Sequence, residues 1–154
     1  MAPPRVIRPQ SVLFACGLNS VRSPMAAYLF RQLIGSSVYV GSAGVRKSAL
    51  DRFAVGVMEE IGIDIGKHRP VTFEELEDLE GFNFDLIVTL SPEAHHKALE
   101  LTRTMAAEVE YWPTSDPSVI DGSREQRISA YREVRDQLAD RIRQRFDWRT
   151  PGNE

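Results

Sequence analysis

The stretch SVLFACGLNSVRSP, residues 11–24, decides the fold of this chain and carries its chemistry. Its apolar beginning predicts a short buried strand that ends at Cys16, the only cysteine of the sequence. Arg22 follows six residues later, and Ser23, followed by proline, predicts the N-cap of a helix. The pattern indicates a tight loop between strand and helix, in which a thiol and a guanidinium form a site for a tetrahedral oxyanion.

The predicted loop has the properties of an anion-binding site. Successive backbone N–H groups can surround an anion, and the positive end of the following helix faces it and favours the thiolate form of Cys16. Arg22 offers a planar fork that can bind two phosphoryl oxygens and stabilise charge in the transition state. With Cys16 as nucleophile, the phosphate-binding residues we predict are Gly17, Leu18, Asn19, Ser20, Val21, Arg22 and Ser23.

Individual loop residues suit this role, although each also has a plainer explanation. Gly17 allows close backbone approach, and Asn19 tolerates a left-handed conformation. Ser23 can donate its hydroxyl to the thiolate, and Ser42 can support the loop through hydrogen bonds. The alternatives are that Cys16 is a buried structural thiol and that Asn19 and Ser42 are ordinary turn residues.

Composition restricts the class of protein. The chain has 154 residues, 42% of them hydrophobic, and a net charge of -3, which predicts one soluble domain and argues against nucleic-acid binding. One cysteine excludes an internal disulfide, and no apolar run predicts a signal peptide or a membrane span. We therefore expect a cytoplasmic protein with a loose arm (residues 1–9), one domain (10–148) and a tail (149–154).

Strand and helix patterns alternate along the chain. This alternation predicts an α/β three-layer sandwich, a four-stranded parallel sheet with helices on both faces. The loops that follow the strands should then face one crevice, which would contain Cys16, Ser42, Ser91 and Asp116. The predicted strands are 11–15, 38–40, 84–90 and 109–112, with small residues at 41–44 forming a loop, and the predicted helices begin near 23, 50, 72, 91 and 123.

Asp116 is the candidate acid and base. Loss of an aryl or alkyl oxide needs a proton and hydrolysis of a thiophosphate needs a base, and one carboxyl group can serve both steps. Pro117 restricts Asp116 to an extended conformation. Asp116-Pro117 can also be a simple loop dipeptide, and Asp121 is the next candidate acid.

The stretch VLFACGLNSVRSPMAAYLF resembles the signature of the low-molecular-weight protein tyrosine phosphatases, as do GSAG at 41–44, FDLIVTL at 84–90 and Asp116-Pro117. The resemblance implies a four-stranded parallel sheet, no metal, no organic cofactor and a two-step reaction through a phosphocysteine. It makes Cys16 the nucleophile, Arg22 the phosphate ligand and Asp116 the general acid. It also implies a phosphorylated protein or small aryl phosphate as substrate, and a monomer or weak homodimer.

Departures from that signature leave other functions open. Ser118 and Val119 stand where phosphotyrosine-specific members have tyrosines, and Val21 stands where a second loop cysteine is common. DLIVTL and YWPTSDP also resemble arsenate reductases of the same fold; with one cysteine, such an enzyme would need an external thiol. A phospho-ligand binding module with little catalysis is the third alternative.

Side chains outside the loop are expected to be structural. Tyr111 and Trp112 are predicted to be core residues at the end of a strand. The adjacent His95 and His96 are expected to be solvated, and His68 with Arg69 is expected to form an exposed basic turn.

Overall fold

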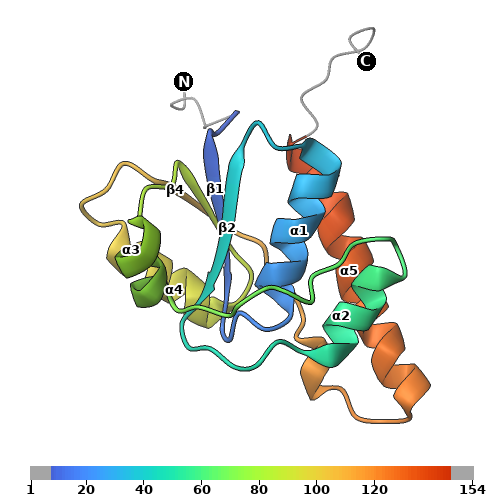
Figure 1. Cartoon of the computed structure of the whole chain (residues 1–154). Coiled ribbons are helices and arrows are strands. Elements are labelled where there is room, and N and C mark those ends of the chain that lie inside the picture. The colour runs from blue at the N-terminus through green and yellow to red at the C-terminus, as the bar shows by residue number, and fades with distance from the viewer. Residues whose placement is uncertain (1–7, 147–154) are drawn as a thin grey trace, which may run out of the picture.

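The computed structural model describes residues 8–146, so residues 1–7 of the predicted arm and the whole predicted tail lie outside the described residues. It shows a four-stranded parallel sheet in the order β2-β1-β3-β4, covered by helices on both faces (Figure 1). The predicted α/β fold is confirmed. The strands are β1 (Ser11–Cys16), β2 (Tyr39–Gly44), β3 (Leu86–Thr89) and β4 (Glu108–Tyr111). The helices are α1 (Arg22–Ile34), α2 (Arg52–Glu59), α3 (Phe73–Glu80), α4 (Pro92–Leu101) and α5 (Arg124–Phe146), with a short 3-10 turn η1 (Pro117–Val119).

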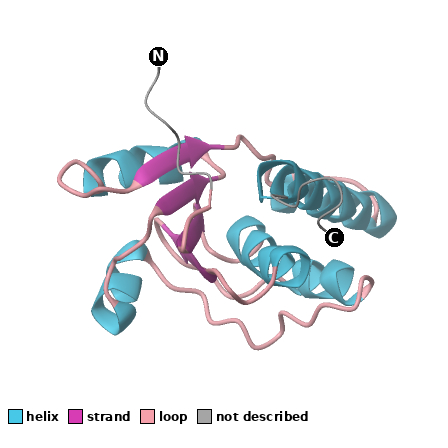
Figure 2. Cartoon of the chain, turned by 90° about the horizontal axis from the view of Figure 1, so that it is seen from above, coloured by secondary structure: helices cyan, strands magenta, loops and turns pink. Residues whose placement is uncertain are grey.

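Strand β1 lies in the middle of the sheet and explains why its sequence is continuously apolar. It pairs with β2 on one side and with β3 on the other, and helices cover both of its faces. Val12 and Phe14 point toward the core beneath α1, α2 and α5, whereas Leu13 and Ala15 point toward α3 and α4. All four side chains are fully buried. Figure 2 shows the resulting three layers from above.

An aromatic cluster holds the larger layer together. Phe14 contacts Phe30 of α1 and Trp112, with ring centroids 5.9 and 6.0 Å apart, and Phe30 contacts Phe146 edge-on at 5.0 Å. Trp112 is buried, as predicted. Burying each such ring contributes about 2–3 kcal/mol, so the end of α5 is fixed against α1 and the sheet.

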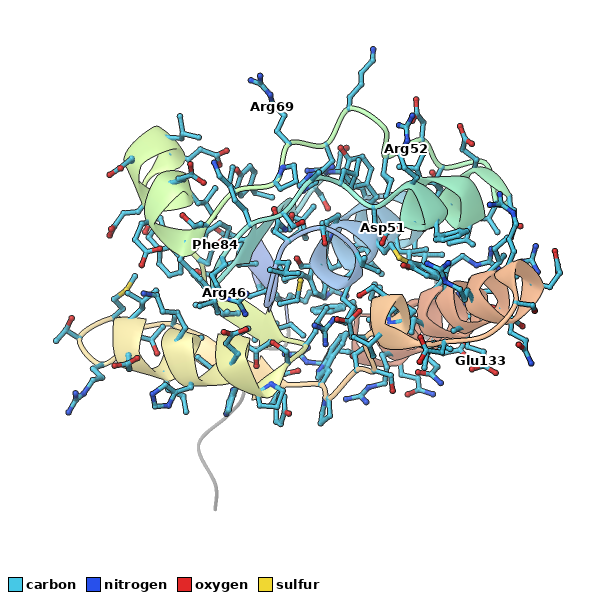
Figure 3. The ribbon with its side chains drawn as sticks, turned by 90° about the horizontal axis from the view of Figure 1, so that it is seen from below. Arg46, Asp51, Arg52, Arg69, Phe84 and Glu133 are labelled. Atoms are coloured by element: carbon cyan, nitrogen blue, oxygen red, sulfur yellow. The ribbon has the colours of Figure 1, made fainter. Side chains whose placement is uncertain are left out.

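The strand order places the loops of interest together. The chain leaves β1 for β2 on one side and later returns to β3 on the other, so the loops diverge beyond the carboxyl end of β1. The carboxyl ends of all four strands meet at one edge, which Figure 3 views from below. Arg46 and Asp51 lie toward the middle of this view, and Arg69 projects outward.

Helix starts agree with the sequence patterns at three places. Thr72 and Glu75 form a complete capping box, Ser91 accepts a hydrogen bond from the Ala94 amide at 3.2 Å, and a reciprocal pair joins Ser123 and Gln126.

The prediction that Ser23 is a helix N-cap was wrong. Helix α1 begins one residue earlier, at Arg22, without a side-chain cap, and the Ser23 hydroxyl is directed toward Cys16 instead.

The prediction of a loop at 41–44 was also wrong, because β2 continues through Gly44 and pairs with β1 as far as Cys16. The predicted strand at 84–90 is shorter, covering only 86–89. Within residues 8–146 no helix is long and apolar enough to cross a membrane.

Candidate active site

The loop after β1 is held from behind by the segment that follows β2. Four loop carbonyls accept backbone hydrogen bonds of 2.9–3.2 Å from this segment. Since the C=O and N–H groups across a trans peptide bond point in opposite directions, this arrangement leaves the N–H groups that follow these carbonyls free to face an anion. The bonds run from Val45 to Cys16, from Arg46 to Gly17, from Ser48 to Leu18 and from Asp51 to Ser20.

The side chain of Asn19 holds the loop in place through hydrogen bonds. It is fully buried and has φ +53°, the left-handed conformation predicted for it. Its amide nitrogen donates to the hydroxyl oxygens of Ser23 (2.8 Å) and Ser42 (3.0 Å). Its carbonyl oxygen accepts from the Val71 amide at 2.9 Å and lies 3.1 Å from Nε2 of His68. One side chain thus connects the loop to β2 and to the segment before α3.

The Cys16 sulfur lies at the bottom of the site. The residue is 2% exposed, and its Sγ is 3.0 Å from the Ser23 hydroxyl oxygen. Because Asn19 already donates to that oxygen, the Ser23 proton can point toward sulfur, and this donation stabilises a thiolate. The next acceptor of that proton, the Ala43 carbonyl, is farther away at 3.4 Å.

Arg22 and Asp116 approach each other across the site from the loops after β1 and β4. The Arg22 guanidinium donates to the Thr114 carbonyl (2.9 Å), and its other terminal nitrogen is 3.8 Å from Oδ2 of Asp116. The Ser118 amide and hydroxyl bind Oδ1 of Asp116 at 2.9 and 2.6 Å. One carboxylate oxygen is therefore held, while the other faces Arg22.

These side chains surround a small hollow. It is lined by Cys16, Leu18, Ser20, Val21, Arg22, Asp116 and Ser118. The structure thus brings the predicted nucleophile, guanidinium and acid together. Asp121, the other candidate acid, is exposed and does not line the hollow.

One glycine of this site is required by close backbone contacts, and a second faces a side chain. A Cβ on Gly44 would overlap the Arg46 carbonyl oxygen and lie 2.8 Å from the Asn19 nitrogen, so only glycine fits there. A Cβ on Gly17 would lie 3.0 Å from Oε1 of Glu93, whose two carboxylate oxygens both bind the Arg46 guanidinium at 2.9 Å. Sequence reasoning missed the close contact at Gly44; the run of small residues at 41–44 was the available signal.

Two histidine predictions need correction. His68 is half-buried against Asn19 and Tyr28 rather than exposed, although the neighbouring Arg69 is exposed as predicted. Burial lowers the pKa of His68, assisted by the charge of Arg31 and opposed by the hydrogen bond to Asn19. In α4, His95 is half-buried rather than solvated.

The reason for the burial of His95 is a neighbour in the adjacent strand. Its Nδ1 lies 3.0 Å from the Thr89 hydroxyl, and its ring stacks on Tyr111 with centroids 4.7 Å apart. Tyr111 itself is 37% exposed and is not a core residue, because it lies at the end of the edge strand β4. His96 is exposed, as predicted. In residues 8–146, no group of three or more His, Cys, Asp or Glu side chains could hold a metal ion.

Comparison with known proteins gives the family. The model for the low molecular weight phosphotyrosine protein phosphatases matches residues 11–148. The chain belongs to this family. Among its relatives, the arsenate reductase of Bacillus subtilis is 32% identical, over 86% of this chain and 92% of that protein. The glutaredoxin arsenate reductase of Synechocystis sp. is 30% identical, over 86% and 93%.

Solved structures of the family superpose closely on this chain. The low molecular weight protein tyrosine phosphatase of T. tengcongensis has a TM-score of 0.69 and 26% identity, over 86% of this chain and 94% of that one. A cysteine-to-serine mutant of the YwlE arginine phosphatase, with a phosphorylated active-site serine, has a TM-score of 0.67 and 26% identity, over 87% and 91%. Phosphatases and arsenate reductases thus share this fold, and the chain is a member of an enzyme family.

Proposed function

We propose that the protein hydrolyses phosphomonoesters through a phosphocysteine on Cys16. The observation that carries the proposal is the hollow in which the Cys16 thiol, the Arg22 guanidinium and the Asp116 carboxyl group meet. The phosphorylated active-site serine of the YwlE mutant supports a covalent route in a relative.

In the first step the Cys16 thiolate attacks phosphorus, and the bond between phosphorus and the leaving oxygen breaks. Arg22 and the loop N–H groups stabilise the charge on the phosphoryl oxygens, and protonated Asp116 gives its proton to the leaving oxygen. The products of this step are a free alcohol or phenol and a phosphocysteine.

In the second step the Asp116 carboxylate takes a proton from a water molecule, whose oxygen bonds to phosphorus. The sulfur–phosphorus bond breaks, inorganic phosphate leaves, and the electron pair returns to Cys16 as a thiolate. The Ser23 hydroxyl, 3.0 Å from the sulfur, stabilises this leaving thiolate.

The proposed substrate is phosphotyrosine in a protein or another aryl phosphate. The side chains lining the hollow include Leu18 and Val21 but no aromatic ring among the described residues, so the walls do not select strictly for a tyrosine ring. The proposal includes a reducing, cytoplasmic environment, which keeps the single thiol usable, and a monomer or weak homodimer.

Arsenate reduction with an external thiol is the second candidate, favoured by the arsenate reductase relatives. The Cys16 thiolate would displace water from arsenate and form a sulfur–arsenic bond. The external thiolate would then attack the Cys16 sulfur, the electron pair of that bond would pass to arsenic, and arsenite would leave. A second thiol would reduce the mixed disulfide, since the sequence offers no other cysteine.

An assay with p-nitrophenyl phosphate on the wild type, Cys16→Ser and Asp116→Asn, run beside arsenate with glutathione, tests both candidates. We expect phosphate release by the wild type and its loss in Cys16→Ser. Arsenite production with negligible phosphate release would overturn the hydrolase proposal in favour of the reductase. Tight vanadate binding without turnover in either assay would favour the binding module.

A further inference from the structure

Two arginines and a phenylalanine form a cluster between the starts of α2 and α5. The guanidinium carbons of Arg127 and Arg124 lie 4.9 and 5.3 Å from the centroid of the Phe53 ring. Both distances are within the range of cation–π attraction, so the ring holds two positive charges near each other. Residues Phe53, Arg124 and Arg127 are called the arginine cluster below.

The arginine cluster lies next to the loop of the active site. Phe53 follows Asp51 by two residues, and the Asp51 amide donates to the Ser20 carbonyl at 3.1 Å. The Phe53 ring packs on Tyr131 with centroids 5.3 Å apart, and the Tyr131 hydroxyl donates to the Asp51 carboxylate at 2.7 Å. Figure 3 shows Asp51 beside the centre of this face, with Arg52 above it in the view.

Charges of Asp116 and of the arginine cluster both act on the Tyr131 hydroxyl group. Burial, the hydrogen bond to Asp51 and the charges of Asp51 and Asp116 raise the pKa of Tyr131, whereas the charge of Arg127 acts in the opposite direction. The η1 turn, which begins after Asp116, also packs on α5. The turn that follows Asp116 and the arginine cluster therefore both lie on or against α5.

The two guanidinium groups differ from four of the five arginines farther along the same helix; the fifth, Arg141, lies over the Trp112 ring. Arg132, Arg135, Arg143 and Arg145 each pair with a carboxylate. Over residues 8–146, neither Arg124 nor Arg127 is in an ion pair. Both also lie in the first turns of α5, where the helix dipole disfavours a cation. The positive charges of Arg124 and Arg127 are thus not paired with a carboxylate among the described residues.

We propose that the arginine cluster binds an acidic side chain of the substrate, and that the substrate is a phosphoprotein segment with Asp or Glu close to the phosphorylated residue. This inference rests on the proposed phosphatase function. An extended peptide advances about 3.3 Å per residue, so a carboxylate two or three residues from the phosphorylated residue lies about 7–10 Å along the peptide from it. Shortly after Asp116 in the chain, Val119 and Ile120 are 71% and 42% exposed and offer apolar contact to a peptide chain.

Matched phosphotyrosine peptides test the inference, one with glutamates flanking the phosphotyrosine and one with glutamines. For the wild type at low ionic strength we expect kcat/KM to be about fivefold higher for the acidic peptide, mainly through KM, and we expect salt to reduce the ratio. The double substitution Arg124→Gln, Arg127→Gln should bring the ratio to about one and leave p-nitrophenyl phosphate hydrolysis unchanged.

The double substitution Arg132→Gln, Arg143→Gln is the control, because it removes the same two positive charges from the same helix at arginines already paired with Glu60 and Asp140. A wild-type ratio of one, or an equal loss for the two peptides in the double variant, would overturn the inference. So would the same effect in the control variant Arg132→Gln, Arg143→Gln, since the effect would then come from net charge alone.

Binding of both peptides to Cys16→Ser, measured by calorimetry, separates the inference from the proposed function. If the wild type hydrolyses nothing, the phosphatase proposal fails, while tighter binding of the acidic peptide that depends on Arg124 and Arg127 still supports the cluster. Equal affinity for the two peptides, or no binding of either, contradicts the cluster as well.

Discussion

The loop around Cys16 and the loop around Asp116 are built in different ways. The first is buried, and its backbone and side chains are bonded to β2, to the segment after it and to the segment before α3. The second is held by the Ser118 contacts and by Arg22, and the Asp116 side chain is 27% exposed. The loop around Cys16 is thus fixed by several surrounding segments, whereas Asp116 has fewer contacts and is partly exposed to solvent.

The largest expected effect is the loss of hydrolysis when the thiol of Cys16 is removed. Cys16→Ser should lower the hydrolysis of p-nitrophenyl phosphate by about 10⁴-fold or more, because no other thiol can form the intermediate. Vanadate should still bind, since the loop N–H groups and Arg22 remain. Retained hydrolysis in this variant would show that the loop only binds anions.

Asp116→Asn should have the next largest effect, a loss of about 10²–10⁴-fold in kcat for an alkyl phosphate, whose leaving group needs a proton. For p-nitrophenyl phosphate, whose leaving group is stable as an anion, the loss should be smaller. Asp121→Asn is the matched control and should change kcat little, because Asp121 does not line the hollow. Equal losses in both variants, or an equal loss for both substrates, would contradict the role of Asp116.

The hydrogen bonds of Asn19, in the loop around Cys16, should contribute to the free energy of unfolding. Asn19→Ala removes the hydrogen bonds to Ser23, Ser42 and Val71 and places alanine at φ +53°. We expect urea unfolding to give a loss of about 2–4 kcal/mol. Asn19→Gly tolerates the backbone conformation and should recover about 1 kcal/mol of this loss. No difference between the two variants would mean that the left-handed conformation is not maintained by the fold.

The smallest effect is a dependence of stability on pH. Since burial lowers the pKa of His68 from 6.5 in the folded state, the unfolded chain takes up this proton first as the pH falls. The contribution of His68 is therefore complete above about pH 6.5 and is lost as the pH falls through the lowered value. Urea unfolding at several pH values should show less loss between pH 7.5 and 5 in His68→Gln than in the wild type. An equal loss would mean that His68 is solvated.

Local signals in the sequence were sufficient to predict the fold. The apolar run before Cys16 and the cap patterns at Thr72, Ser91 and Ser123 depend on neighbouring residues, and the structure confirms them. The spacing of Cys16 and Arg22 belongs to a single loop, so it could also be identified without knowing the fold.

Residues whose partners are far along the chain could not be placed from the sequence. His68 was expected to be exposed because its partner Asn19 lies 49 positions away. The residues around Gly44 looked like a loop, yet they continue the strand by pairing with β1 as far as Cys16, and position 44 is glycine because the Asn19 backbone passes too close for a side chain. Ser23 was assigned to the helix cap, but the sulfur competes for its hydroxyl.

Mass spectrometry of a quenched reaction tests the central claim most directly. Asp116→Asn, mixed with p-nitrophenyl phosphate and quenched in acid, should accumulate the mass of one phosphoryl group on the peptide that contains Cys16, because this leaving group needs no proton in the first step and the variant lacks the base for the second. A phosphoryl group found on another residue, or steady turnover with no adduct in both the wild type and the variant, would contradict a phosphocysteine intermediate.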